Sequence, residues 1–98
     1  MFEIRLGEQG EVIMTGRLDA AQCDKALQFT DGILAPRVVD LAGLDYVSSA
    51  GLGVLLKTQK RVMASGQGLR LVNANKHIRD IFKYAGFDRI FEIVPAGS

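Results

Sequence analysis

Two adjacent hydroxyl side chains, Ser48 and Ser49, lie where an apolar run gives way to a predicted helix. A serine at this place can act as the helix N-cap, because its oxygen can accept one of the free backbone N–H groups. The same N–H groups and the positive end of the helix dipole also favour a phosphate. Ala50 and Gly51 are small, so we expect them to leave room for a phosphoryl group on Ser49. The pair therefore predicts a cap that can also be a switch, in which about −1.5 to −2 added charges would expel a docked partner.

Catalysis by these serines is not supported by the residues around them. A hydrolase nucleophile needs the pattern Gly-x-Ser-x-Gly and a histidine base, but the serines are flanked by Val47 and Ala50 and the sequence has one histidine, His77. The sequence offers one histidine and one cysteine, far apart, and no paired carboxylates at ligand spacing, so it does not favour a metal site. Segment 50–53 lacks the lysine of a P-loop. We therefore expect no catalytic residue, no metal and no cofactor.

Asp19 is the second candidate site residue. Its simplest role is to cap a helix that runs to about Asp31. Like the serine pair, Asp19 follows a predicted strand, so the two loops would adjoin if the strands are neighbours. A carboxylate there could orient a serine hydroxyl or contact a partner.

The elements that must position these residues alternate along the chain. Hydrophobic periodicity predicts strands at 2–6, 11–15, 37–41, 69–72 and 90–94, and helices from Asp19 to about Asp31, over 49–64, and between Asn75 and Gly86. The order β-β-α-β-α-β-α-β predicts an α/β fold with a largely parallel sheet and one antiparallel strand from the opening hairpin. Functional groups of such sheets gather beyond the carboxyl ends of the strands, which is where the serine pair lies.

The same patterns predict where two strands end and which helix residues are buried or exposed. Segment 16–19 is expected to end the second strand, and Gly43 to bound the central one. Two helices are expected to bury apolar stripes: Leu52, Leu55, Leu56, Val62 and Met63 in the second, and Ile78, Ile81, Phe82 and Ala85 in the third. Lys57, Lys60 and Arg61 are expected to face solvent.

Composition limits the class of protein. The chain has 98 residues, 48% of them hydrophobic, and a net charge of +1. It is therefore expected to form one domain, 1–98, without a broad electrostatic surface for nucleic acid or anionic membrane. A single cysteine, no membrane span and no secretion signal favour the cytoplasm. The oligomeric state stays open, since the first strand can be an exposed edge of the sheet.

Taken together, these residues resemble the STAS domains, specifically the stand-alone bacterial anti-sigma factor antagonists. The resemblance covers essentially the whole chain and is carried by Gly-Arg-Leu-Asp at 16–19, Val-Val-Asp-Leu at 38–41, the segment 44–52, and Tyr-Ala-Gly-Phe at 84–87. It implies the STAS fold. Because the chain stops four residues past Val94, the family's usual last helix is expected to be absent or reduced.

The resemblance also implies roles for residues. The family loop reads Asp-Ser-Ser-Gly or Asp-Ser-Thr-Gly, and the residue after the aspartate is phosphorylated. Aligned on Gly51, Ser48 takes the place of the aspartate, Ser49 that of the phosphoacceptor, and Ala50 that of the second hydroxyl. Asp19 falls where the family has an aspartate near the phosphorylation site. The implied switch loop thus comprises Asp19, Ser48, Ser49, Ala50, Gly51 and Leu52.

The function implied by the resemblance is partner switching without catalysis. The unphosphorylated domain would bind an anti-sigma factor of the histidine-kinase-like ATPase type, which acts as a serine kinase on Ser49. A PP2C-type phosphatase would reset the cycle. The alternatives are a STAS accessory subunit of a phospholipid-trafficking ABC transporter, a scaffold that is not phosphorylated, and an enzyme or small-ligand binder with a pocket near Asp19 and Ser49.

Overall fold

A five-stranded mixed sheet forms the centre of the protein. The computed structural model describes residues 1–33, 37–64 and 66–95. The strands, in spatial order, are β1 (Phe2–Leu6), β2 (Val12–Leu18), β3 (Val38–Val47), β4 (Arg70–Ala74) and β5 (Glu92–Pro95). β1 pairs with β2 antiparallel, and every other neighbouring pair is parallel. The predicted α/β class and the predicted antiparallel opening hairpin are confirmed.

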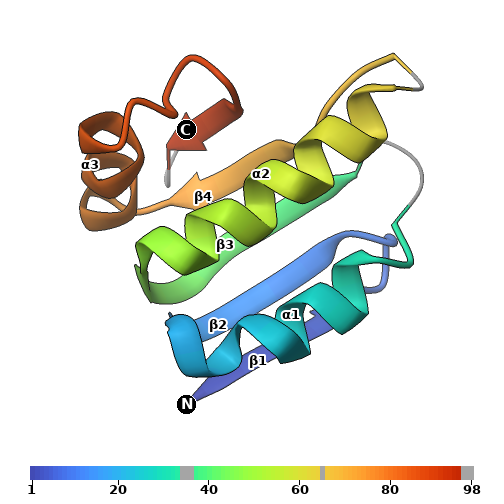
Figure 1. Ribbon diagram of the computed structural model, residues 1–98, viewed down its shortest axis with the longest axis horizontal. Coiled ribbons are helices and arrows are strands. Elements are labelled where there is room, and N and C mark those ends of the chain that lie inside the picture. The colour runs from blue at the N-terminus through green and yellow to red at the C-terminus, as the bar shows by residue number, and fades with distance from the viewer. Residues whose placement is uncertain (34–36, 65, 96–98) are drawn as a thin grey trace.

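Helices cover one side of this sheet. They are the short 3-10 turn η1 (Ala20–Gln22), α1 (Cys23–Thr30), α2 (Ser49–Met63) and α3 (Lys76–Tyr84). Figure 1 shows α1 and α2 side by side over the same face of the sheet, and α3 beside the end at which β4 terminates. α3 contacts β3, β4 and β5. Within the described ranges, no helix is both long and apolar enough to span a bilayer.

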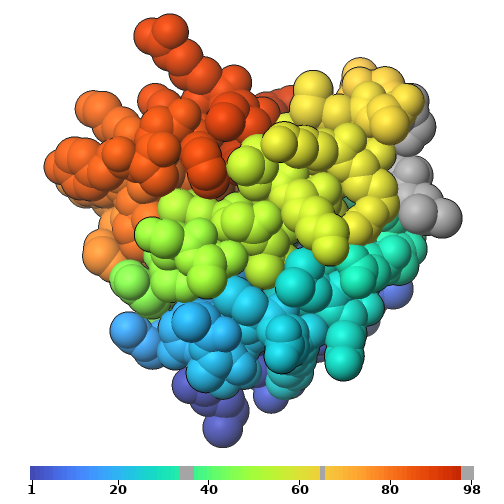
Figure 2. Space-filling view, in the orientation of Figure 1, coloured from blue at the N-terminus to red at the C-terminus, as the bar shows by residue number. Residues whose placement is uncertain are grey.

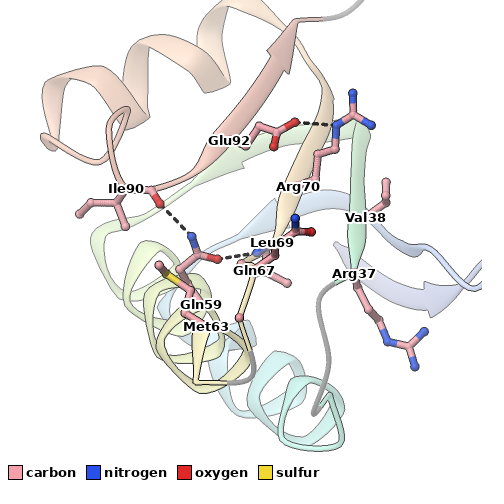
Figure 3. Close-up of a pocket in the computed structure, with 11 residues that line it drawn as sticks. Arg37, Val38, Gln59, Met63, Gln67, Leu69, Arg70, Ile90 and Glu92 are labelled. Atoms are coloured by element: carbon pink, nitrogen blue, oxygen red, sulfur yellow. Dashed lines mark hydrogen bonds and ion pairs between the residues drawn. The ribbon is translucent and has the colours of Figure 1, made fainter.

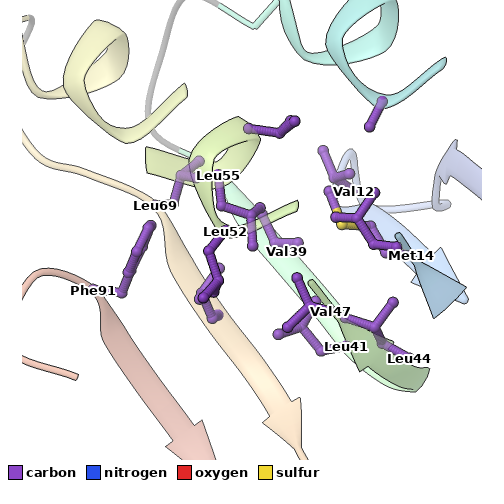
Figure 4. Packing of buried hydrophobic residues seen from close by; sticks show 14 of the residues in the cluster. Val12, Met14, Val39, Leu41, Leu44, Val47, Leu52, Leu55, Leu69 and Phe91 are labelled. Atoms are coloured by element: carbon purple, nitrogen blue, oxygen red, sulfur yellow. The ribbon is translucent and has the colours of Figure 1, made fainter. Parts of the chain in front are cut away.

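The core lies between the sheet and these helices. β2 and β3 turn apolar side chains toward the helices, as expected for strands with one covered face. The side chains that meet there are fully or almost fully buried, and they include Val12, Met14, Val39, Leu41, Leu52 and Leu55 (Figure 4). Each such side chain contributes about 1.5–3 kcal/mol of hydrophobic stabilisation, so this layer fixes α2 on the sheet.

Two strands are longer than the sequence predicted, because glycines expected to end them lie inside them. β2 continues through Gly16, whose φ of 88° suits glycine. A Cβ on Gly16 would overlap the carbonyl oxygen of Met1. β3 continues through Gly43, where a Cβ would lie 2.6 Å from Cγ2 of Thr15 on β2. Both glycines therefore permit close strand packing, and the predicted ends at 15 and 41 are wrong.

Other boundaries differ less. The first predicted helix begins as the 3-10 turn η1, and residue 34 lies outside the described residues. β4 and β5 each start and end one or two residues later than predicted. α2 and α3 lie where they were expected. The expectation about a last family helix concerns the chain after Pro95, which is outside the described residues.

Three side chains do not lie where periodicity placed them. Met63 is 51% exposed, because the last turn of α2 carries it to the rim of a cavity. Ala85 is exposed as the C-cap residue of α3. Arg61 is half-buried rather than in solvent, since its guanidinium donates to the carbonyl oxygen of Thr30 at 2.7 Å and to Asp31 at 2.9 Å. These two bonds tie α2 to the end of α1.

Candidate functional site

The carboxyl ends of β2 and β3 bring the two candidate loops together. Leu18 and Val47 are paired in the parallel register, and the N–H of Ser48 donates to the carbonyl oxygen of Leu18 at 2.9 Å. Asp19 follows the first of these strands and Ser48 the second. The loops that we expected to adjoin are therefore neighbours.

Ser48 is the N-cap of α2. Its Oγ accepts the N–H of Gly51 at 3.1 Å, and its carbonyl oxygen accepts the N–H of Leu52 at 2.8 Å. Its backbone is extended, with φ −84° and ψ 172°, as is usual for this position. The prediction that one serine of the pair caps the helix is confirmed, and its hydroxyl is occupied by that role.

Ser49 is the first residue of α2 and differs from its neighbour. Its side chain is exposed, and within the described residues no hydrogen bond occupies its hydroxyl. The 15-residue helix behind it places a positive dipole end and unpaired N–H groups at this point. Ser49 thus combines a free hydroxyl with a position that stabilises an added phosphate.

Gly51 and Leu52 form the inner side of the same helical turn. Both are buried, Leu52 with 4% exposure. A Cβ on Gly51 would lie 2.7 Å from the carbonyl oxygen of Leu18 and 2.8 Å from Cγ2 of Val47. The space left by the missing side chain of Gly51 is filled by the protein itself, so it is not the open approach that we expected. These two residues hold α2 against the ends of β2 and β3.

The outer side of the turn is open because of Ala50 and Gly53. Both are exposed, and a Cβ on Gly53 would meet no atom within 4 Å. Gly53 lies four residues after Ser49, so the two share a helix face. We call Ser49, Ala50 and Gly53 the α2 face; Figure 2 shows the first turns of α2, in green, at the surface between the start of α1 and helix α3. Gly53 was not among the predicted site residues, although its spacing of four residues from Ser49 indicates the shared face.

Asp19 caps the 3-10 turn that precedes α1. Its Oδ1 accepts the N–H of Ala21 at 3.1 Å, so the capping role predicted for it is confirmed for a shorter element. The Cys23 thiol donates to the carbonyl oxygen of Asp19 at 3.3 Å. Burial raises the pKa of the Cys23 thiol, and the nearby Asp19 and Asp24 carboxylates raise it further. The thiol is therefore protonated at neutral pH and is a weak nucleophile.

A cation–π pair lies in the two strands that lead into these loops. The Arg17 guanidinium stacks on the Tyr46 ring at 4.5 Å from its centroid, and the two residues are neighbours across β2 and β3. Each lies two residues before a candidate loop residue, Asp19 or Ser48. The sequence does not indicate this contact between Arg17 and Tyr46, because it depends on the parallel register of the strands.

Cavities lie elsewhere in the molecule. Two, of about 530 and 490 Å³, share Arg37 and Val38 at the amino ends of the parallel strands. Figure 3 shows the first, in which the Gln59 amide is held by Leu69 and Ile90 at 2.6 and 2.8 Å. Neither cavity is lined by Asp19, Ser48 or Ser49, so neither is the pocket that a small-ligand binder would need there. His77 is exposed on α3.

Fold and loop geometry define an α/β domain whose polar loops meet at the carboxyl ends of β2 and β3. A family model described as "Mlab, STAS domain" matches residues 3–95. The chain therefore belongs to the STAS domain family, and the family that the sequence resembled is confirmed.

Individual relatives are similar over different shares of the chain. BtrV of Bordetella bronchiseptica, named as a candidate anti-sigma factor antagonist, is 41% identical over 56 residues, which are 57% of this chain and 48% of BtrV. The chain thus matches about half the length of that curated relative.

Solved structures extend the likeness to nearly the whole fold. An anti-sigma factor antagonist from Mycobacterium paratuberculosis has a TM-score of 0.80 at 21% identity, over 97% of this chain and 85% of that one. Unphosphorylated SpoIIAA, an anti-sigma factor antagonist, has a TM-score of 0.71 at 17% identity, over 95% and 87%. Phosphorylated SpoIIAA, described as a Bacillus cell fate determinant, has a TM-score of 0.65 at 17% identity, over 95% and 90%. At these identities the likeness shows the STAS fold.

Proposed function

We propose that this domain is an anti-sigma factor antagonist that binds its partner through the α2 face and releases it when Ser49 is phosphorylated. The proposal rests on the different hydrogen bonding of two adjacent serine hydroxyls. Ser48 uses its hydroxyl to cap α2, whereas the Ser49 hydroxyl is exposed and free at the helix N-terminus. The name of the Bordetella relative supports the antagonist role.

The partner in this proposal is an anti-sigma factor of the histidine-kinase-like ATPase type, which also acts as the serine kinase. A PP2C-type phosphatase removes the phosphate, and the cycle runs in the cytoplasm. The STAS domain itself, residues 1–98, is the substrate and the binding module, and it contributes no catalytic group.

The physical basis of release is desolvation and repulsion at a small, uncharged surface. Ala50 and Gly53 let a partner backbone approach α2 closely and exclude water from Ser49. A phosphate adds about −1.5 to −2 charges there, and burying that charge against a partner is costly. A loss of about 2.7 kcal/mol of binding free energy corresponds to about 100-fold in affinity. In the free domain the helix N-terminus stabilises the same phosphate.

Ser48 fits the proposal as a cap in place of the family's aspartate. Serine and aspartate cap helices about equally well, so the loop geometry does not need the carboxylate. Ser48→Asp therefore restores the family residue without disturbing α2, and it places a negative charge one residue from Ser49. This variant is the matched control for charge at the loop.

The binding experiment uses the purified anti-sigma factor of the same organism and isothermal titration calorimetry. Ser49→Ala should keep the wild-type affinity within about threefold, because it removes only an unbonded hydroxyl. Ser49→Asp should bind at least about tenfold more weakly, since its charge points to the partner. Ser48→Asp should bind like wild type, because its carboxylate would accept the N–H of Gly51 as the helix cap instead of facing the partner. Equal affinities for Ser49→Asp and Ser49→Ala would contradict the switch.

The location of the docking face has its own test. Gly53→Arg adds a long side chain where a Cβ meets no atom, so the fold should be unaffected and partner binding should be lost. Gln28→Arg adds the same side chain to an exposed position on α1 and should leave binding unchanged. Equal binding by both variants would place the partner elsewhere.

One second candidate is favoured by a specific residue. The serine at position 48, where the phosphorylated family members carry aspartate, agrees with a STAS accessory subunit of a phospholipid-trafficking ABC transporter, which needs no kinase. Such a subunit would also dock through the α2 face. Capture of an ABC-type ATPase from the organism's own lysate, with no histidine-kinase-like ATPase, would favour this candidate over the antagonist.

A further inference from the structure

Within the described residues, the outer edge of β1 has no neighbouring strand. β1 is the first strand of the sheet and pairs with β2. At its two ends, the N–H of Arg17 donates to the carbonyl oxygen of Met1 at 2.9 Å, and the N–H of Gly7 donates to that of Glu11 at 2.7 Å. Along an antiparallel strand, successive residues point their N–H and C=O groups to opposite sides. Because Met1 and Gly7 bond to the β2 side, the odd-numbered residues turn these groups toward β2. Phe2, Ile4 and Leu6 therefore turn theirs outward.

Among the residues that the structure describes, a single side chain reaches this edge. The Lys25 ammonium donates to the carbonyl oxygen of Phe2 at 3.0 Å and lies 3.9 Å from Oε1 of Glu3. The Lys25 and Glu3 side chains are 49% and 62% exposed, so this ion pair is weak and easily displaced. Leu6 is 52% exposed at the other end of the strand. The edge thus combines outward main-chain groups with an uncovered apolar side chain.

We propose that a second copy of this chain pairs with this edge, antiparallel and about a two-fold axis at Ile4. In that register Ile4 lies opposite Ile4 of the partner subunit, and Phe2 lies opposite Leu6 of the partner subunit. The residues whose main-chain groups point outward are then the ones that face each other in hydrogen-bonded pairs, each of which exchanges two bonds. The exposed Leu6 side chain then lies next to Phe2 of the partner subunit.

Charge selects this register over its neighbours. Glu3 and Arg5 lie on the face of β1 that the helices do not cover, and both are exposed. In the proposed register Glu3 lies opposite Arg5 of the partner subunit, at the positions where side chains come closest. A shift by two residues keeps the outward groups paired but sets Glu3 opposite Glu3 of the partner subunit, or Arg5 opposite Arg5 of the partner subunit. A shift by one residue pairs outward groups with inward ones and turns the apolar face over.

The pairing leaves the candidate site accessible. Asp19 and Ser48 follow the carboxyl ends of β2 and β3, beyond the β1 end that holds Met1. A two-fold axis at Ile4 places the two copies of this site at opposite ends of the joined sheet. The inference does not rest on the proposed function, and a pair of this kind would hold two partners at once.

The experiment is sedimentation equilibrium of the full chain from micromolar to about 1 mM, a range that covers weak association. Wild type should show a reversible monomer–dimer equilibrium. Arg5→Glu opposes carboxylates at both close positions and Glu3→Arg opposes guanidinium groups there, so each should raise the dimer Kd at least about tenfold. The double variant with both changes should regain the wild-type Kd. Thermal melts check that all variants are folded.

Two further measurements test the proposed register and edge. An equimolar mixture of Arg5→Glu and Glu3→Arg should form a heterodimer, because every close pair then joins opposite charges. Lys25→Ala frees the carbonyl oxygen of Phe2 and should lower the dimer Kd. A wild-type chain that stays monomeric at about 1 mM overturns the proposal. So do single charge variants that associate as strongly as wild type, or a mixture that forms no heterodimer.

Discussion

Gly51 and Gly53 lie two residues apart on α2, and they face opposite surroundings. A Cβ on Gly51 would press against Leu18 and Val47, whereas a Cβ on Gly53 would meet nothing within 4 Å. Ser48 and Ser49 differ in the same way, since one hydroxyl is used by the cap and the other is free. The inner side of this turn is shaped by packing, and the outer side keeps small residues that packing does not require.

That contrast separates folding from binding within a single helical turn. Changes on the inner side should alter the free energy of unfolding. Changes on the outer side should leave the fold intact and act on a partner.

The largest effect is expected for Gly51→Ala. The added methyl group would lie 2.7 Å from the carbonyl oxygen of Leu18, so α2 must shift away from β2. Overpacking of this kind costs about 1–3 kcal/mol of the free energy of unfolding. Urea denaturation measures it, with Gly53→Ala as the matched control. A Gly51→Ala variant as stable as that control would show that the close contact is not maintained.

The next effect separates the two serines. Ser48→Ala removes the oxygen that accepts the N–H of Gly51 and should lower the free energy of unfolding by about 0.5–2 kcal/mol. Ser49→Ala should change it by less than about 0.5 kcal/mol, because its hydroxyl makes no bond to the described residues. Urea denaturation curves measure the free energy of unfolding of both variants. A larger loss for Ser49→Ala than for Ser48→Ala would contradict the different roles of the two serines.

A smaller effect of opposite sign is expected for Gly53→Ala. An exposed helix glycine is less favourable than alanine by about 0.5–1 kcal/mol, and here the methyl group has open space. The variant should therefore be more stable than wild type by about that amount. A loss of stability in the same denaturation assay would mean that the outer side is packed after all.

The smallest effect concerns Cys23, next to Asp19. Burial raises the pKa of this thiol most, and the Asp19 and Asp24 carboxylates add to it, so little thiolate exists at pH 7. A raised pKa means that alkylation by iodoacetamide should accelerate as the pH rises above the ordinary range of a free thiol. Asp19→Asn removes one of the two charges and should increase the alkylation rate at pH 8 modestly. An unchanged rate would show that Asp19 does not act on this thiol.

Local chemistry explains what the sequence could predict. Asp19 and one serine of the pair at 48–49 were predicted as caps, and Asp19 and Ser48 each accept a backbone N–H group at the start of an element. Capping depends on the residue type and on groups two or three positions away. The alternation of strands and helices was likewise enough for the α/β fold and its antiparallel opening strand.

What the sequence did not predict depends on contacts between distant segments. Gly16 and Gly43 were interpreted as strand ends, but the neighbouring Met1 and Thr15 make them necessary inside strands. The inward direction of Gly51 depends on how α2 docks on Leu18. Arg61 is held by the end of α1, which periodicity within α2 does not indicate.

The central claim is that Ser49, and not Ser48, is the residue at which the α2 face is switched. The most direct measurement is peptide mass spectrometry of the chain after incubation with ATP and the histidine-kinase-like ATPases of its own organism. We predict a single phosphate on Ser49, because its hydroxyl is exposed and free while that of Ser48 caps the helix. Phosphate on Ser48, or an unmodified chain with an ATPase that binds it tightly, would contradict the account.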